Sequence, residues 1–182
     1  MKTFAMIIHF IFVSILGLCQ ESKIQLFKPS YKQIDSIESF SSYKNLLLDS
    51  TIIADADKVE LKISNTYANK KFGNVSSSIE TSTNYIYSTI DSSVNLILYS
   101  WEGHGEVGRD LIFNQLEKNK KKFKKYFKDA GKADYNDAFM DGWAGNITVW
   151  INKDVTVKQW FYLTNENKIG IKLFIHWKSN YR

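Results

Sequence analysis

Three successive segments near the C-terminus, 146–151, 155–163 and 169–177, constrain the fold more than any other part of the chain. In each segment apolar residues alternate with other residues, which is the pattern of a β-strand that buries one face. The connecting residues, 152–154 and 165–168, are rich in Asn, Asp and Lys. Asn and Asp are favoured in turns because they tolerate left-handed backbone. The three segments therefore predict an antiparallel meander.

The register between these strands can be predicted from their apolar side chains. If Ile151 opposes Val155 and Leu163 opposes Ile169, the alternating aliphatic residues all fall on one face, and a shift by one residue would divide them. The other face then carries large rings between lysines, whereas a solvent-exposed face normally carries short polar residues. The members of this aromatic–basic face are Trp150, Lys158, Trp160, Tyr162, Lys172, Phe174 and His176.

Two interpretations of the aromatic–basic face are open. A helix or a second sheet could cover it, in which case the rings belong to the core. Alternatively, the face meets a ligand, with rings that stack on planar or apolar groups and lysines that attract anions. We expect Trp160 to be packed and Trp150, which is closer to the end of the sheet, to be the more exposed ring.

The remaining chain contributes further strands and helices. Period-two alternation predicts a strand at 59–67 and a hairpin formed by 85–90 and 94–101. Apolar residues at helical spacing predict a long helix at 106–130, and Gly131 is a suitable stop. The expected fold is a single α+β domain over residues 20–182, in which a mostly antiparallel sheet of five or six strands carries the long helix on one face.

Two other segments have weaker patterns. Residues 33–48 have an amphipathic spacing that predicts a second helix, for which the aromatic–basic face is one possible packing site. Residues 69–83 are rich in Ser and Thr and predict a long surface loop, which would be functional or poorly ordered.

The N-terminal residues 1–19 have the pattern of a signal peptide. Lys2 precedes an apolar run at 4–16, and Gly17 and Cys19 are small residues suited to cleavage before Gln20. This pattern predicts a secreted or periplasmic protein with no transmembrane segment after cleavage. A lipoprotein anchored through Cys19 is the less favoured alternative, because Leu18 stands where a small residue is expected. The net charge of +5 does not by itself imply nucleic-acid binding, and none is expected.

A glycine-rich turn before the long helix contains Glu102, His104 and Glu106. Divalent metals accept imidazole and carboxylate together, and His176 could supply a further ligand. The alternative is a flexible turn whose glutamates cap the helix. The spacing matches no helical metal motif, and no G-x-S-x-G sequence marks a nucleophile. These residues are therefore weak metal candidates, and no cofactor is predicted.

Residues 134–142 are rich in Asp and Asn, as calcium-binding loops are, but their spacing departs from the EF-hand pattern. Asp134 as the N-cap of a short helix at 134–140 explains them better.

Lysines crowd the second half of the predicted long helix. Lys120, Lys121, Lys124 and Lys125 are expected on its solvent side, where they could meet an anionic surface. The simpler alternative is a solvated helix face.

The favoured functional hypothesis is a non-enzymatic module that binds a ligand or partner on the aromatic–basic face. One alternative is a metal-assisted hydrolase that uses Glu102, His104 and Glu106. The other is a protein that binds anionic surfaces through its lysine-rich helix. The ligand, the partner and the oligomeric state are not predicted.

Overall fold

The computed structural model describes residues 24–39, 43–45, 52–53, 60–61, 67–127, 133–135, 144–163 and 168–177. The predicted signal peptide, with Cys19, lies outside the described residues. Among the described residues, no helix combines the length and apolarity that a membrane crossing needs.

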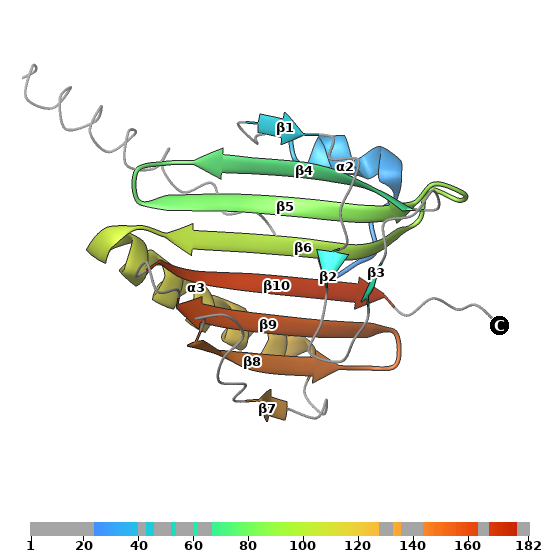
Figure 1. Ribbon diagram of the computed structural model, residues 1–182. Helices are drawn as coiled ribbons and strands as arrows, with labels where there is room; N and C mark the ends of the chain where they lie inside the picture. Colours follow the sequence, from blue (N-terminus) through green and yellow to red (C-terminus); the bar gives the residue numbers. More distant parts are fainter. Residues whose placement is uncertain are drawn as a thin grey trace, which may run out of the picture.

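Eight strands form one antiparallel sheet in the order β1-β4-β5-β6-β10-β9-β8-β7 (Figure 1). Their bounds are β1 Tyr43–Asn45, β4 Tyr67–Val75, β5 Ile79–Ser88, β6 Val94–Gly103, β7 Ala133–Tyr135, β8 Ala144–Ile151, β9 Val155–Leu163 and β10 Ile169–Trp177. The short strands β2 (Ile52–Ile53) and β3 (Glu60–Leu61) pair in a separate two-stranded sheet. The described helices are α2 (Tyr31–Ile37) and α3 (Gly105–Tyr126).

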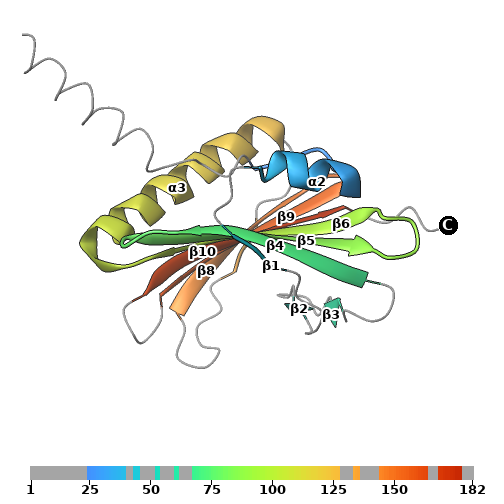
Figure 2. The ribbon, with the colours of Figure 1, turned by 90° about the horizontal axis from the view of Figure 1, so that it is seen from above.

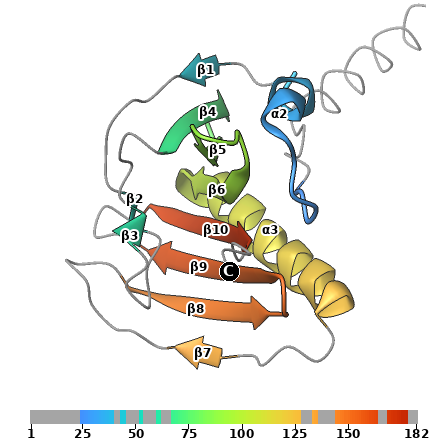
Figure 3. The same cartoon turned by 90° about the vertical axis from the view of Figure 1, so that its right-hand side faces the viewer.

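The structure has a layered arrangement around the large sheet. Helices α2 and α3 lie against one face, and β2 and β3 lie on the other side (Figures 2 and 3). The predicted α+β fold is confirmed, with an antiparallel sheet of six long strands, a three-residue strand at each edge, and a long helix packed on one face.

The hydrophobic core lies between the sheet and the two helices. Alternate residues of β6 and β10 supply it from the sheet, because every second side chain of a strand points to the same face. Buried core residues on these two strands and on α3 include Ile97, Tyr99, Trp101, Ile171, Leu173, Ile175, Ile112, Leu116 and Phe123. Ile34 places α2 in the same core, so packing of this helix on the aromatic–basic face, one option for segment 33–48, is wrong.

The predicted register of the meander is confirmed for one strand pair and wrong for the other. Between β9 and β10, Leu163 opposes Ile169 and Trp160 opposes Lys172, as expected. Between β8 and β9, however, Ile151 opposes Thr156 instead of Val155.

The turn between β8 and β9 explains the one-residue shift. The Asn152 backbone N–H donates to the carbonyl oxygen of Val155 at 2.9 Å, so the turn proper contains only Lys153 and Asp154. The Asn152 side-chain oxygen also accepts from the backbone N–H groups of Asp154 and Val155, at 2.8 and 2.7 Å. A two-residue turn, where three residues were predicted, moves every β8 side chain to the opposite face.

Helix α3 begins one residue before its predicted start and ends at Tyr126, and the residues beyond Phe127 lie outside the described range up to Ala133. The apolar residues whose helical spacing predicted this helix include Val107, Ile112, Leu116 and Phe123. The last three are buried, but Val107 is 63% exposed. A polar residue that this set does not include, Asn119, is buried instead.

Two other predictions fail in the described residues. Segment 69–83 is not a loop, because β4 and β5 form a hairpin in which Phe72 opposes Thr83. Both side chains are buried, and Phe72 belongs to the same core cluster as Ile34 of α2, so a Ser- and Thr-rich sequence forms strands here. The second predicted helix ends at Ile37, and residues 43–45 form β1. Most of the predicted strand at 59–67 and of the turn at 165–168 lies outside the described residues.

Candidate functional site

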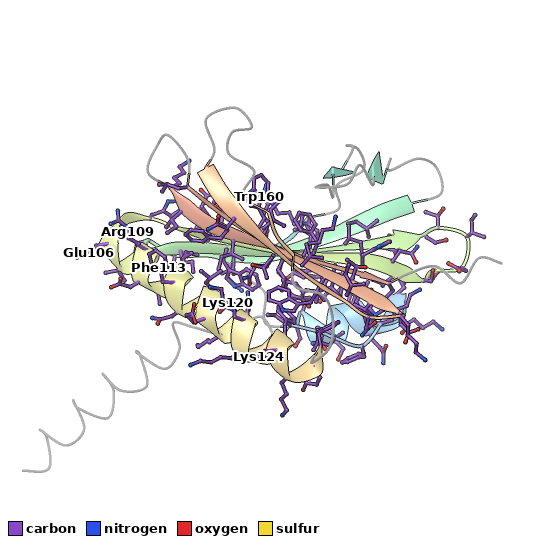
Figure 4. The ribbon with its side chains drawn as sticks, turned by 90° about the horizontal axis from the view of Figure 1, so that it is seen from below. Glu106, Arg109, Phe113, Lys120, Lys124 and Trp160 are labelled. Atoms are coloured by element: carbon purple, nitrogen blue, oxygen red, sulfur yellow. The ribbon has the colours of Figure 1, made fainter. Side chains whose placement is uncertain are left out.

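The aromatic–basic face is present on the side of the sheet away from α3, with one member fewer than predicted. Its residues on β9 and β10 share that side: Lys158, Trp160, Tyr162, Lys172, Phe174 and His176. Figure 4 shows Trp160 on the side of the sheet opposite the labelled residues of α3.

Trp150 does not belong to this face. It pairs with Val157, and its ring packs on Phe123 of α3 with 4.8 Å between ring centroids. Its side chain is 6% exposed, so the expectation that Trp150 is the more exposed tryptophan is wrong, and Trp160 is the half-buried one. The cause is the shortened turn between β8 and β9, which turns Trp150 towards the core.

The small sheet of β2 and β3 covers only one end of the aromatic–basic side. Where β6 begins, Ile86 and Leu96 are fully buried although they point away from the helices. Figures 1 and 2 place β2 and β3 over this end of the sheet. His176 pairs with Leu96 at the same end. The interpretation that a second sheet covers the face therefore applies to this end. The face residues Phe174 and His176 here are half-buried, and so are Trp160 and Lys172 towards the end of β6 that leads into α3.

Towards the α3 end, Trp160, Tyr162, Lys172 and Glu102 form what we name the ring–lysine cluster. Tyr162 is fully buried, at 1% exposed, and the other three side chains are half-buried. The Lys172 Nζ lies 5.4 Å from the centroid of the Trp160 ring and 5.7 Å from that of the Tyr162 ring. The two rings are tilted, with 5.6 Å between their centroids. These distances are in the range of cation–π interactions, so both rings hold the ammonium group in place.

Glu102 joins the cluster from β6. The Tyr162 hydroxyl donates to a Glu102 carboxylate oxygen at 3.5 Å, and the Lys168 Nζ lies 3.9 Å from the other oxygen. The cluster therefore combines side chains from β9, β10 and β6: two rings, a hydroxyl donor, a carboxylate and an ammonium group. Lys168, just before β10, places a second ammonium group beside it.

A glycine in the middle of β10 makes this arrangement possible. Gly170 pairs with Tyr162 on one side and with Glu102 on the other. A Cβ atom at Gly170 would lie 2.4 Å from the Cζ of Tyr162. The Tyr162 ring thus lies across the backbone of β10 and reaches Glu102, a close approach that a glycine in a strand interior permits.

Burial determines the charge states in the cluster. It raises the pKa of Tyr162 to about 12, with a further contribution from the neighbouring Glu102 carboxylate, so the hydroxyl stays protonated at neutral pH and acts as a hydrogen-bond donor. Burial also lowers the pKa of Lys172, while Glu102 opposes that change. At neutral pH Tyr162 therefore cannot act as a general base.

Small polar side chains continue the site onto the neighbouring strands. Across the sheet, Trp160 pairs with Lys172, Lys172 with Ser100, and Ser100 with Ser82. The two serines are half-buried and lie on the same side as the rings. A large ring, an ammonium group and two hydroxyl groups therefore follow one another in a single cross-strand row.

The weak metal candidates do not assemble into a site. Glu102 is engaged with Tyr162, whereas Glu106 is exposed on the first turn of α3. His176 is far from Glu102, because the length of β10 between Gly170 and His176 is about 20 Å at about 3.3 Å per residue. No group of three or more His, Cys, Asp or Glu residues close enough to hold a metal exists in the described parts of the chain.

The glycines around His104 have a packing role that the sequence analysis missed. A Cβ atom at Gly108 would lie 2.2 Å from the carbonyl oxygen of Ser78, and one at Gly103 would lie 2.5 Å from the carbonyl oxygen of Gly108. The His104 backbone N–H also donates to the Ser78 carbonyl oxygen at 2.8 Å. These glycines let α3 start directly against β6 and the β4–β5 turn. Their spacing, G-x-G-x-x-G, is the available signal, but the antiparallel sheet differs from the βαβ unit that binds dinucleotides.

The lysine-rich half of α3 lies on the helix side of the sheet, away from the ring–lysine cluster. Lys120, Lys121, Lys124 and Lys125 are all exposed, as predicted. Lys122 differs from them, because its ammonium donates to the carbonyl oxygen of Ile24 at 2.7 Å and burial lowers its pKa.

The calcium-like segment can be described only at its start. Asp134 lies in β7 and not at the N-terminus of a helix, and residues 136–143 lie outside the described range.

Among the predicted site residues, the structure brings together Trp160, Tyr162 and Lys172, and it adds Glu102, which had been assigned to a different site. Gly170 and Ser100 were not predicted. An isolated glycine within an otherwise alternating strand was the available signal for Gly170. Ser100 joins the site only through the pairing of β6 with β10. Comparison of the chain with protein-family models, with curated protein sequences and with solved structures finds no match, so the interpretation of the site rests on its own residues.

Proposed function

We propose that the protein is an exported, non-enzymatic module that binds a ligand over the ring–lysine cluster. The observation that carries this proposal is the half-buried Lys172 ammonium group, which lies against the half-buried ring of Trp160 and the fully buried ring of Tyr162. The helix side of the same strands is mainly aliphatic, and Gln159, which bonds to Asn119 of α3, is its buried polar exception. A departure from a simple packing pattern at one place on an otherwise consistent fold is expected at functional sites.

The chemistry of the cluster restricts the ligand class. The Trp160 ring offers a flat apolar surface, the Lys172 ammonium attracts an anionic or carbonyl oxygen, and Ser100 and Ser82 offer hydroxyl groups beside them. The ligand that fits best has a planar or apolar face next to an acidic group. Aromatic and alicyclic carboxylates combine these two properties in a small molecule.

The test measures binding of a panel of aromatic and alicyclic carboxylates to the purified protein. Tryptophan fluorescence and titration calorimetry detect the binding. Trp160→Ala and Lys172→Met should each weaken binding of a ligand from this panel by about tenfold or more, because a stacked ring contributes about 1–3 kcal/mol. The neutral amide of the same compound should bind more weakly to the unchanged protein.

Phe113→Ala and Lys121→Met are the matched controls. Phe113 is an exposed ring and Lys121 an exposed lysine on α3, on the other side of the sheet. These two variants should bind the ligand with unchanged affinity. The proposal fails if no carboxylate of the panel binds, or if the control variants weaken binding as much as Trp160→Ala and Lys172→Met.

A further inference from the structure

The second half of α3 presents a concentrated positive charge to solvent. Its exposed lysines, which we name the lysine face, are Lys118, Lys120, Lys121, Lys124 and Lys125. At about 1.5 Å per residue they occupy about 10 Å of helix length. Figure 4 shows Lys120 and Lys124 on the helix, on the side of the sheet opposite Trp160.

Few carboxylates offset this charge. Glu117 pairs with Lys120 at 3.2 Å between the ammonium nitrogen and the carboxylate oxygen. Within the described residues, Lys121 and Lys124 have no ion-pair partner. The other two acidic residues of the helix, Glu106 and Asp110, lie near its start. The positive charge is therefore confined to the second half of α3.

The helix dipole explains only part of this arrangement. Cations are favoured near the C-terminus of a helix, and the effect falls off within the last turn. Lys124 and Lys125 lie in the last turn of α3, but Lys118, Lys120 and Lys121 come before it. Packing does not explain these earlier lysines either, because their side chains are exposed, in contrast to Lys122, which bonds to Ile24.

The composition of the lysine face distinguishes between polyanions. Surface helices that bind bilayers insert apolar and aromatic side chains, whereas the apolar residues of this half of α3, Leu116 and Phe123, are buried against the sheet. Proteins that bind single-stranded nucleic acids stack bases on aromatic rings interleaved with the positive charges. No ring is interleaved between the lysines of the lysine face, and its single exposed ring, Tyr126, lies at the helix end, where the Lys125 ammonium is 5.8 Å from the ring centroid. Ammonium groups alone suit a hydrated polyanion whose charges are on its surface.

We infer that the lysine face is a second, independent binding surface, and that its partner is an acidic polysaccharide with sulfate or carboxylate groups. A flexible chain of this type can follow the curved outer side of a helix, so that several sugar residues each place an anion near a different lysine. Association through such contacts is electrostatic and therefore weakens steeply as salt is added.

The experiment compares binding of the purified protein to dextran sulfate and to neutral dextran over a series of salt concentrations. The unchanged protein should bind dextran sulfate alone, and the double variant Lys121→Gln/Lys124→Gln should bind it about tenfold more weakly, with a shallower dependence on salt. Its melting temperature should not change, because substitutions at exposed positions usually have little effect on stability.

The matched control removes the same charge elsewhere. Lys32 on α2 and Lys153 in the β8–β9 turn are exposed, and Lys32→Gln/Lys153→Gln should bind dextran sulfate within about twofold of the unchanged protein. Trp160→Ala should also bind it normally, which separates this inference from the proposed carboxylate site. Equal losses in the two double variants would overturn the inference, because net charge alone would then explain binding. Tighter binding to anionic lipid vesicles or to single-stranded DNA than to dextran sulfate would overturn it as well.

Discussion

The two sides of β9 and β10 follow the same alternation but have different chemistry. On the helix side, Val157, Ile171 and Leu173 are fully buried aliphatic residues. On the other side, Trp160 and Lys172 are half-buried and in contact with each other. Burial of apolar area accounts for the first side. It does not account for a partly dehydrated ammonium group between rings on the second, which is the reason for placing the ligand site there.

The largest expected effect concerns the two tryptophans that were assigned to one face. Trp150→Ala should lower the free energy of unfolding by about 3–5 kcal/mol, because it removes a buried ring that packs on Phe123. The melting temperature should fall by about 10 °C or more at this chain length. Trp160→Ala should lower it by less than half as much. Thermal unfolding followed by circular dichroism measures both, and equal losses would show that the two sides are packed alike.

The next largest loss of stability is expected when a buried polar pair on the helix side is broken. The Asn119 side-chain amide donates to the Gln159 side-chain oxygen at 2.7 Å, and both residues are 1% exposed. Asn119→Ala leaves Gln159 without this partner and should cost about 1–3 kcal/mol in urea unfolding. The control is Asn114→Ala, since Asn114 is exposed on the same helix and should change stability by no more than about 0.5 kcal/mol. A loss at Asn114 as large as at Asn119 would contradict this account.

Substitution of one glycine on each side of the sheet tests how rigidly the two sides are packed. An added Cβ at Gly108 meets the Ser78 backbone oxygen, so Gly108→Ala should cost about 1–2 kcal/mol after the gain of about 1 kcal/mol in helix propensity. At Gly170 the added Cβ meets the end of the Tyr162 ring first, with the Trp101 carbonyl oxygen at 2.8 Å. The first atoms met at Gly170 are the end of a side chain and those met at Gly108 are backbone, so Gly170→Ala should cost less stability but weaken ligand binding by displacing Tyr162. Chemical unfolding measures the stability of the two variants, and titration measures their ligand affinity. A larger loss of stability in Gly170→Ala than in Gly108→Ala would show that the ligand side is the more rigidly packed.

The smallest effect is a change in stability at alkaline pH. The pKa of Tyr162 rises from 10.0 to about 12 in the folded protein, so between these values the unfolded chain loses a proton that the folded chain keeps. Stability therefore falls as the pH rises from about 10 to 12. Tyr85 and Tyr99 on the helix side act in the same direction, since burial raises their pKa values too. The lowered pKa of Lys172 acts in the opposite direction, because its burial penalty ends when it deprotonates.

Urea unfolding at a series of pH values from 8 to 11.5, chosen to span roughly the ordinary tyrosine pKa, measures this change. Tyr162→Phe should make the alkaline loss of stability shallower, and Tyr126→Phe, at an exposed tyrosine on α3, should leave it unchanged. An unchanged slope in Tyr162→Phe would mean that the hydroxyl of the ring–lysine cluster titrates normally.

Local pattern was enough to predict much of this fold. The alternation along β9 and β10 predicted their register, and with it the shared face of Trp160, Tyr162 and Lys172. Helical spacing predicted α3, and the exposure of its lysines followed from helix geometry. These features depend on residues within one element or on neighbouring strands, and for such short separations the periodicity of the side chains carries the information.

Other features depended on the tertiary structure. The side on which Trp150 lies was decided by a two-residue turn, which a count of polar residues cannot distinguish from a three-residue turn. The hairpin of β4 and β5 was hidden because its Ser and Thr residues resemble a loop until Phe72 and Thr83 are buried together. The ring–lysine cluster required the pairing of β10 with β6, which brings Glu102 beside Gly170. No local pattern encodes that pairing, because it depends on which strands α3 allows to meet in the sheet.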